Sequence, residues 1–122
     1  MIRIGMVGLG MAVQPHMLAI RDLEAAGRVR LAGGYAPSVA RREAFAAKWN
    51  APVFGTLDAL IAESDQLLVL TPPGARLPVA EAAAAARKHL IVEKPLEITA
   101  ARAEALVGVA ARAGVTLGVV FQ

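Results

Sequence analysis

The fold of this chain is decided by residues 1–12, which read Met1-Ile-Arg-Ile-Gly-Met-Val-Gly8-Leu9-Gly10-Met11-Ala12. Residues 2–7 are a short apolar run bounded by glycine, which predicts a buried β-strand. The glycines lead into residues 11–26, where apolar side chains recur at helical spacing. We expect the inner face of this helix to carry Met17, Leu18, Ile20 and Leu23. A strand, a glycine turn and a helix together predict the first unit of an α/β fold.

The remainder of the chain repeats this alternation of short apolar runs and longer helical patterns. We expect five further strands, over residues 29–35, 52–54, 66–70, 89–93 and 115–121, of which 52–54 is the weakest. Helices are expected over residues 39–49 and 57–62, from Gly74 to Lys88, and from Thr99 to Ala113. Right-handed crossovers convert this order into an α/β, doubly wound parallel sheet. The simplest strand order is 3-2-1-4-5-6, that of a Rossmann fold.

Length and hydropathy limit the classes of protein that fit. The chain's 122 residues (12.7 kDa) are enough for one domain, residues 1–122, with its own core. The hydrophobic fraction of 57% owes much to alanine, and no apolar run approaches the roughly 18 residues of a spanning helix. We therefore expect no membrane partner. The absence of cysteine excludes disulfides and thiolate metal sites, and it favours the reducing cytoplasm.

The charge of the chain does not favour a nucleic-acid partner. Its net charge of +3 comes from arginines that are scattered along the sequence, with no basic run of five or more. Proteins that bind nucleic acid usually concentrate positive charge on one face. We expect neither a nucleic-acid partner nor a metal site, and we interpret His16 and His89 as structural or surface residues.

The turn after the first strand has the features of a dinucleotide site. Gly8 permits a tight turn, Gly10 lets the backbone approach a pyrophosphate, and the following helix offers free N–H groups at its start. Val13 stands where a third glycine or alanine is usual. The alternative interpretation is an ordinary strand-to-helix turn.

The end of the second strand bears on the choice between NAD and NADP. Residues 34–38 contain no carboxylate to hold a ribose 2′-hydroxyl, whereas Ser38 and Arg41 follow Ala36 closely. A hydroxyl and guanidinium groups, from Arg41 and Arg42, suit a 2′-phosphate. We therefore expect NADP or NAD, with NADP favoured. Alternatively, both arginines are solvated helix residues.

Two further motifs follow the fourth and fifth strands. Residues 71–74, Thr-Pro-Pro-Gly, force the chain to leave the sheet. Glu93-Lys94-Pro95 then places a lysine where it could donate or accept a proton beside a nicotinamide ring. The alternatives are a plain strand-ending turn and a solvated surface lysine.

All these motifs fall at the carboxyl ends of strands, which meet at one edge of a parallel sheet, where ligands bind. Lys94 is the candidate catalytic residue. The candidate cofactor-binding residues are Gly8, Leu9, Gly10, Met11, Ala12, Ala36, Ser38, Arg41, Thr71, Pro72, Pro73, Arg76, Glu93 and Lys94.

The same motifs resemble the Gfo/Idh/MocA family of oxidoreductases, named after glucose-fructose oxidoreductase and inositol dehydrogenase. The resemblance is carried by residues 7–10 (Val-Gly-Leu-Gly), 71–73 (Thr-Pro-Pro), 88–96 (Lys-His-Leu-Ile-Val-Glu-Lys-Pro-Leu) and 118–122 (Gly-Val-Val-Phe-Gln). It implies that Lys94 contacts substrate and nicotinamide and that Pro95 is cis. The family commonly has Asn and His where this chain has Pro73 and Arg76. It also has a second, substrate-binding domain, which this chain does not contain.

The resemblance implies an NAD(P)-binding domain of an enzyme that transfers hydride between nicotinamide and a sugar-like or polyol substrate. We expect this chain alone to bind cofactor with little turnover, and to form a homo-oligomer through the apolar surface that a second domain would cover. The alternative is a non-catalytic, nucleotide-sensing or partner-binding module. A further domain beyond Gln122 in the gene would favour the enzyme, and a stop codon would favour the sensor.

Overall fold

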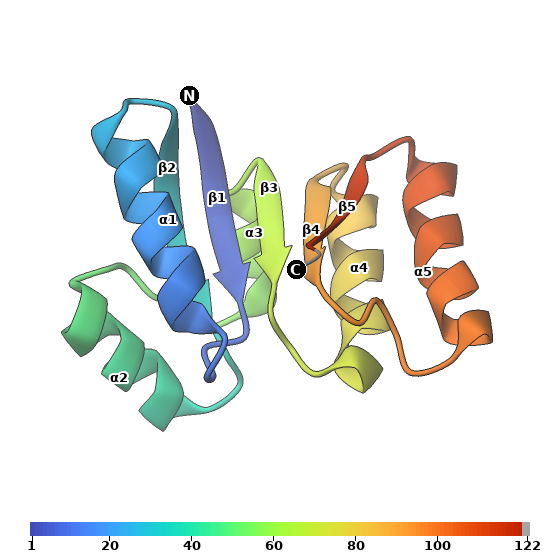
Figure 1. Ribbon diagram of the computed structural model, residues 1–122, viewed down its shortest axis with the longest axis horizontal. Coiled ribbons are helices and arrows are strands. Elements are labelled where there is room, and N and C mark those ends of the chain that lie inside the picture. Colours follow the sequence, from blue (N-terminus) through green and yellow to red (C-terminus); the bar gives the residue numbers. More distant parts are fainter. Residues whose placement is uncertain (121–122) are drawn as a thin grey trace.

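Five parallel strands form the central sheet of the computed structural model, which describes residues 1–120 (Figure 1). In spatial order they are β2 (Val29–Tyr35), β1 (Ile2–Val7), β3 (Gln66–Val69), β4 (His89–Glu93) and β5 (Leu117–Val120). Every neighbouring pair is parallel. The chain moves from β1 to one side for β2 and to the other side for β3, so the switch point lies between β1 and β3. The predicted doubly wound, Rossmann-like sheet is confirmed.

The prediction of six strands was wrong by one. Residues 52–54 make only an isolated parallel bridge, between Val53 and Gly34 of β2. Gly34 N–H donates to the Pro52 carbonyl and Phe54 N–H donates to the Gly34 carbonyl, and no longer ladder follows. Pro52 has no N–H to donate, and Gly55 directly follows Phe54, so the segment is too short and too interrupted for a strand. Part of the predicted last strand, residue 121, lies outside the described residues.

Helices cover both faces of the sheet (Figure 1). One face carries α1 (Val13–Ala25) and α2 (Val39–Trp49), and the other carries α3 (Leu57–Ala62), α4 (Arg76–Ala85) and α5 (Ala100–Ala113). A 3₁₀ turn, η1 (Pro73–Ala75), precedes α4. The hydroxyls of Ser38, Thr56 and Thr99 each accept the backbone N–H three residues on, at the start of α2, α3 and α5. Those three helix starts are local signals, readable in the sequence.

The alternation of side chains along the strands divides the core in two. Ile4 and Met6 of β1 pack with α1 and α2, whereas Val7 packs with the helices of the opposite face. On that opposite face, Ala80 and Ala83 of α4 are buried against Leu90 of β4. Their small side chains allow the helix to lie close to the sheet.

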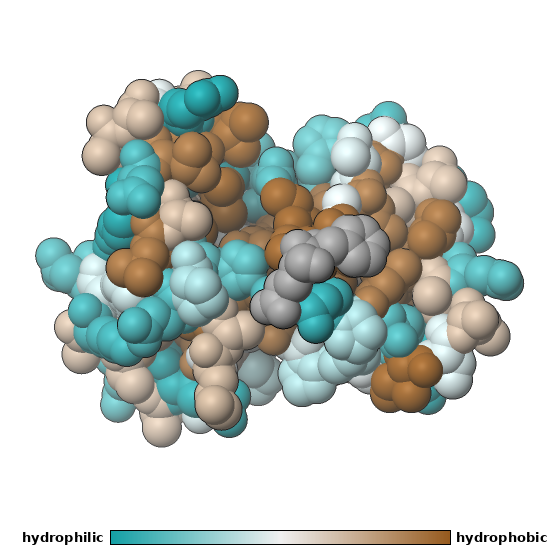
Figure 2. Space-filling model, viewed as in Figure 1, coloured by the Kyte–Doolittle hydropathy of each residue, from teal (hydrophilic) through white to brown (hydrophobic). Residues whose placement is uncertain are grey.

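The predicted inner face of α1 was half wrong. Met17 and Ile20 are buried, but Leu18 is 53% exposed and Leu23 is 38% exposed. Figure 2 shows hydrophobic residues at the surface over α1. The buried positions are Val13, Met17 and Ile20, which follow the i, i+4, i+7 spacing of one helix face. Leu18 lies one residue, and so about 100°, away from that face.

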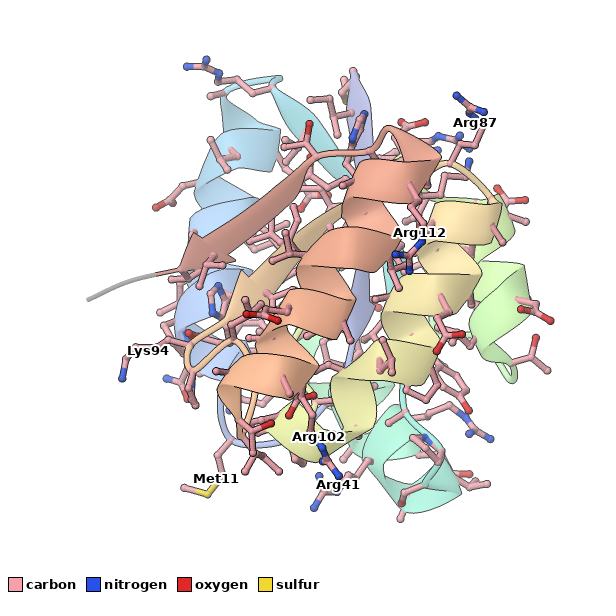
Figure 3. All side chains as sticks on the ribbon, turned by 90° about the vertical axis from the view of Figure 1, so that its right-hand side faces the viewer. Met11, Arg41, Arg87, Lys94, Arg102 and Arg112 are labelled. Atoms are coloured by element: carbon pink, nitrogen blue, oxygen red, sulfur yellow. The ribbon has the colours of Figure 1, made fainter. Side chains whose placement is uncertain are left out.

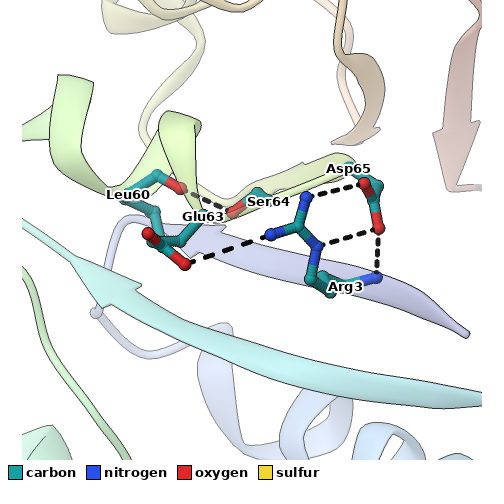
Figure 4. A network of polar contacts seen from close by, with 5 residues as sticks. All are labelled: Arg3, Leu60, Glu63, Ser64 and Asp65. Carbon is teal, nitrogen blue, oxygen red and sulfur yellow. Dashed lines mark hydrogen bonds and ion pairs between the residues drawn. The ribbon is translucent and has the colours of Figure 1, made fainter.

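A charged cluster joins the beginnings of β1 and β3, at the end of the sheet opposite the strand carboxyl ends (Figure 4). Asp65 accepts hydrogen bonds from the backbone N–H and the guanidinium of Arg3, at 2.8 and 3.0 Å. Glu63 lies 4.0 Å from the same guanidinium. Within residues 1–120, no helix is both long enough and apolar enough to cross a membrane.

Candidate cofactor-binding site

The carboxyl ends of β1, β2, β3 and β4 surround a cavity of about 760 Å³. This volume lies within the range of small-molecule and cofactor sites. All the residues that the sequence predicted for the site line the cavity, and the structure adds Pro37 and Leu70. Figure 3 shows Met11, Arg41 and Lys94 toward one end of the molecule, with Arg87 at the other. The structure thus brings together motifs from positions 8 to 94 of the chain.

Gly8 allows the turn after β1 to pack closely against residues 70 and 71, which follow β3. Its φ of +93° is in the region that favours glycine. A Cβ at this position would lie 2.8 Å from the Thr71 nitrogen and 2.9 Å from the Leu70 carbonyl carbon. The turn after β1 can therefore lie against the turn after β3 only because residue 8 has no side chain.

The start of α1 has backbone N–H groups that can donate hydrogen bonds to a ligand. No side chain caps this helix, since Ala12 occupies the N-cap position. Unpaired N–H groups and the helix dipole at such an end suit an anion such as a pyrophosphate. Val13, which replaces the usual third glycine or alanine, is buried in the core beneath α1.

Thr71 supplies an observation that points to a ligand. Its Oγ1 atom is buried, and in residues 1–120 it is the one buried side-chain oxygen or nitrogen without a hydrogen-bond partner. Such a group costs free energy unless something pairs with it. Thr71 lines the cavity, so a bound polar molecule could supply the missing partner. This oxygen, the close turn at Gly8 and the uncapped α1 fit a dinucleotide.

Arg41 and Arg42 are adjacent in the sequence and have different environments. Arg42 Nη1 donates to the carbonyls of Ala36 and Pro37, at 2.7 and 3.2 Å, so it braces the loop after β2. The Arg41 side chain is exposed at the cavity, and its Nη1 would lie 3.1 Å from a Cβ built on Gly10. Of the two arginines, only Arg41 has a guanidinium without a partner among residues 1–120, so it is available to meet a phosphate there.

Glu93, the last residue of β4, connects the Glu93-Lys94-Pro95 motif to α1. Its Oε1 atom lies 2.8 Å from His16 Nε2, and its Oε2 atom accepts the Lys94 backbone N–H at 3.0 Å. The hydrogen bond with His16 lowers the pKa of Glu93. The Lys94 side chain is exposed, and the Lys94–Pro95 bond is cis. Sequence reasoning missed His16, because its partner lies 77 positions away and no local pattern reveals the contact.

Arg76 lines the cavity, but its guanidinium is directed to main-chain carbonyls. The residue is 3% exposed. Its Nε atom donates to Thr71 O at 3.0 Å, and its Nη1 atom donates to the carbonyls of Glu93, Pro95 and Leu96. Burial lowers the pKa of Arg76.

A doubly wound parallel sheet with a glycine turn and a cavity of mixed polarity at its switch point defines a dinucleotide-binding domain of the Rossmann type. The chain matches, over residues 2–121, the model of an oxidoreductase family with an NAD-binding Rossmann fold. It belongs to this family, Gfo/Idh/MocA, and the resemblance found in the sequence is confirmed.

Several relatives with known names share this domain. The UDP-N-acetylglucosamine 3-dehydrogenase of Acidithiobacillus ferrooxidans is 32% identical over 108 residues, which are 88% of this chain and 33% of that protein. The WlbA dehydrogenase of Bordetella pertussis, solved with NADH and UDP-GlcNAcA, is 30% identical with a TM-score of 0.87, and the match covers 98% of this chain and 36% of that one. Biliverdin reductase of Synechocystis sp. PCC 6803, solved with biliverdin and NADP+, is 32% identical with a TM-score of 0.82, covering 97% and 37%. The chain therefore spans about a third of the length of these relatives.

Proposed function

We propose that this chain holds a nicotinamide dinucleotide for an oxidoreductase that acts on a sugar-like substrate. The observation that carries the proposal is the cavity where four strand ends meet, with the buried, unpaired Thr71 hydroxyl beside it. In the proposed complex, the turn at residues 8–12 and the uncapped start of α1 bind the pyrophosphate. The Thr71 hydroxyl hydrogen-bonds to the cofactor as well.

Lys94 is the proposed catalytic residue. When bound, the nicotinamide ring accepts or supplies the hydride. The ammonium group of Lys94 would polarise the substrate oxygen and hold or release its proton. Its position supports this role, because the side chain is exposed at the cavity and emerges from the end of β4.

A sugar nucleotide is the substrate class that the relatives favour. One is named as a UDP-N-acetylglucosamine dehydrogenase, and another was solved with UDP-GlcNAcA. The biliverdin complex of a third relative shows that family membership alone leaves other substrates open. Because these relatives are about three times longer, we propose that turnover needs groups outside these 122 residues and that this chain alone binds cofactor with little turnover.

A variant of Lys94 tests its role in the full-length protein, with UDP-N-acetylglucosamine as the substrate probe. We expect Lys94→Ala to lower kcat by about 10²- to 10⁴-fold, the usual contribution of a positioned acid or base. Cofactor affinity should change far less. Unchanged kcat in a folded Lys94→Ala protein would remove Lys94 from the mechanism.

NADP is the proposed preference, because Arg41 is free at the cavity and no carboxylate follows β2. Dissociation constants for NADPH and NADH, measured by nicotinamide fluorescence, test it. We expect tighter binding of NADPH, and Arg41→Ala should weaken NADPH about tenfold, as for one charged hydrogen bond, while NADH changes little. Arg112→Ala, on α5, is the matched control. Equal affinities, or tighter NADH binding, would contradict the preference.

We also propose that the protein self-associates in the cytoplasm without a nucleic-acid or membrane partner. Two apolar side chains of the α5 region, Ile98 and Val107, are 64% and 49% exposed, which supports burial against another surface. Light scattering of this chain tests self-association. A monomeric mass at about millimolar concentration would contradict it.

A further inference from the structure

Arg76 connects two of the turns that form the cavity. Its Nε atom donates to the Thr71 carbonyl, two residues after β3, and its Nη1 atom donates to the carbonyls of Glu93, the last residue of β4, and Leu96. These two turns have no covalent connection near the site, because α4 and β4 lie between them in the chain. Beyond the last paired residues of β3 and β4, Val69 and Val92, one guanidinium is hydrogen-bonded to both turns.

The carbonyls that Arg76 Nη1 contacts lie on both sides of Lys94. Glu93 precedes the lysine, and Pro95 and Leu96 follow it. The Lys94 N–H is held separately, by the Glu93 carboxylate. The backbone that carries Lys94 is thus held, while the lysine side chain remains exposed at the cavity.

We propose that Arg76 is a positioning residue, which holds the Glu93–Leu96 backbone against Thr71 and so fixes the place of the Lys94 ammonium relative to the cofactor. The last step rests on the function proposed above. In this role Arg76 acts on Lys94 through the backbone, because its Nε and Nη1 donors face main-chain oxygens. This role differs from the cofactor contact that the sequence predicted for Arg76.

An arginine suits this position better than a lysine. The guanidinium presents donors in a rigid planar fork, so Nε and Nη1 can face carbonyls of two different turns. A lysine has donors on one atom only and cannot reach both turns from the same place. Arg76→Lys therefore keeps the positive charge and removes the bridge. Arg76→Met keeps a similar apolar stem and removes both the charge and the bridge.

The first experiment uses the ligand-free protein and measures backbone ¹⁵N order parameters. We expect values of about 0.85 at Thr71, Glu93, Lys94 and Leu96, as in rigid backbone, and a fall toward about 0.6 in Arg76→Lys and Arg76→Met. Leu67 and Leu90, inside β3 and β4, should not change. Arg102→Lys is the matched control, because this exposed guanidinium lies near Gly74 in the same region and bridges no turns.

The second experiment measures the ratio of the affinities for NADP+ and NADPH. A Lys94 ammonium near the ring opposes the cationic, oxidised cofactor, so Lys94→Met should favour NADP+ by about fivefold, as expected for one charge about 4 Å away in water. If Arg76 places that ammonium, Arg76→Met should shift the ratio in the same direction. The double variant should then shift it no further, because the two changes remove one interaction.

The outcomes separate the positioning role from the proposed function. Loss of order confined to the two turns supports the bridge, and unchanged order or a uniform loss through the sheet overturns it. Additive shifts in the cofactor ratio, or equal weakening of both cofactor forms, would overturn the link to Lys94. Absence of binding by the wild-type chain would overturn the proposed function, and the order parameters would still decide the bridge.

Discussion

Gly8 is the residue on which the shape of the cavity depends most directly. Its positive φ and its closeness to Thr71 make any side chain at this position unfavourable. Gly27, after α1, offers a useful contrast. It has a similar φ of +73°, but nothing lies within 4 Å of a Cβ built there.

Alanine variants at Gly8 and Gly27 distinguish the cost of backbone strain from the cost of steric contact. Gly27→Ala should cost about 1 kcal/mol, because a non-glycine residue then adopts a left-handed conformation. Gly8→Ala should cost about 1 to 3 kcal/mol more and weaken NADPH binding, because the turn must move away from Thr71. Urea denaturation and fluorescence titration of both variants measure these effects. Equal costs at the two sites would show that the turn has room for a side chain.

At this scale, the sequence reveals some roles and conceals others. Gly8 is recognisable because it follows an apolar run and opens a helical pattern. Arg41 and Arg42 are indistinguishable in the sequence, and only the packing of the loop after β2 directs one to carbonyls and leaves the other exposed. The His16–Glu93 and Arg76 contacts are also tertiary. The role of a residue in a turn can be predicted from the local pattern of the sequence. The direction of a long side chain cannot, because it depends on tertiary packing.

At the scale of elements, the Arg3–Asp65 pair fastens β1 to the start of β3 (Figure 4). The hydrogen bonds from Arg3 lower the pKa of Asp65 from 3.8 to about 2. Because the pKa is lower in the folded state, this pair stabilises the fold above about pH 4. That contribution is lost as the pH falls from about 4 to about 2.

Asp65→Asn tests this linkage. We expect the variant to have a lower Tm at pH 7 and a smaller decrease in Tm between about pH 5 and pH 2.5 than the wild type has. Circular dichroism melting curves measure both quantities. Asp22→Asn, which removes an exposed carboxylate from α1, is the control. Parallel pH profiles for Asp65→Asn and the wild type would contradict the assignment.

The alanines of α4 set the distance between this helix and the sheet. Ala83 is fully buried, whereas Ala85, two residues further along α4, is exposed. Ala83→Leu should destabilise the protein by about 1 to 3 kcal/mol, because the added carbons have no space. Ala85→Leu should change the free energy of unfolding by less than about 0.5 kcal/mol. Urea midpoints of the two variants measure the difference, and similar midpoints would show that α4 has room to shift.

The elements themselves were largely predictable, since their signals are local. Ser38, Thr56 and Thr99 mark helix starts, and Gly114 ends α5 in a left-handed conformation. The prediction of a strand at residues 52–54 was wrong because only Val53 pairs with β2, and the local sequence does not show how many residues will pair. The prediction that Leu18 is buried was wrong because the buried face of α1 is narrower than the number of apolar residues in the helix suggests.

At the scale of the whole molecule, the high hydrophobic content has a structural explanation. Two apolar cores, one on each side of a parallel sheet, use small and aliphatic side chains. The same architecture brings all four strand-end motifs to one edge. The cavity is therefore a consequence of topology, and its chemistry depends on a few polar groups: the Thr71 hydroxyl, Arg41 and Lys94.

The most direct measurement is an NMR titration of this chain with NADPH, with backbone amide shifts followed residue by residue. We expect saturable binding, with the largest shifts at Gly8, Gly10, Ser38, Thr71 and Lys94, and small shifts at Arg3 and Asp65, which lie at the opposite end of the sheet. Binding that does not saturate, or shifts centred away from the cavity, would contradict the proposal that this edge of the sheet holds a nicotinamide dinucleotide.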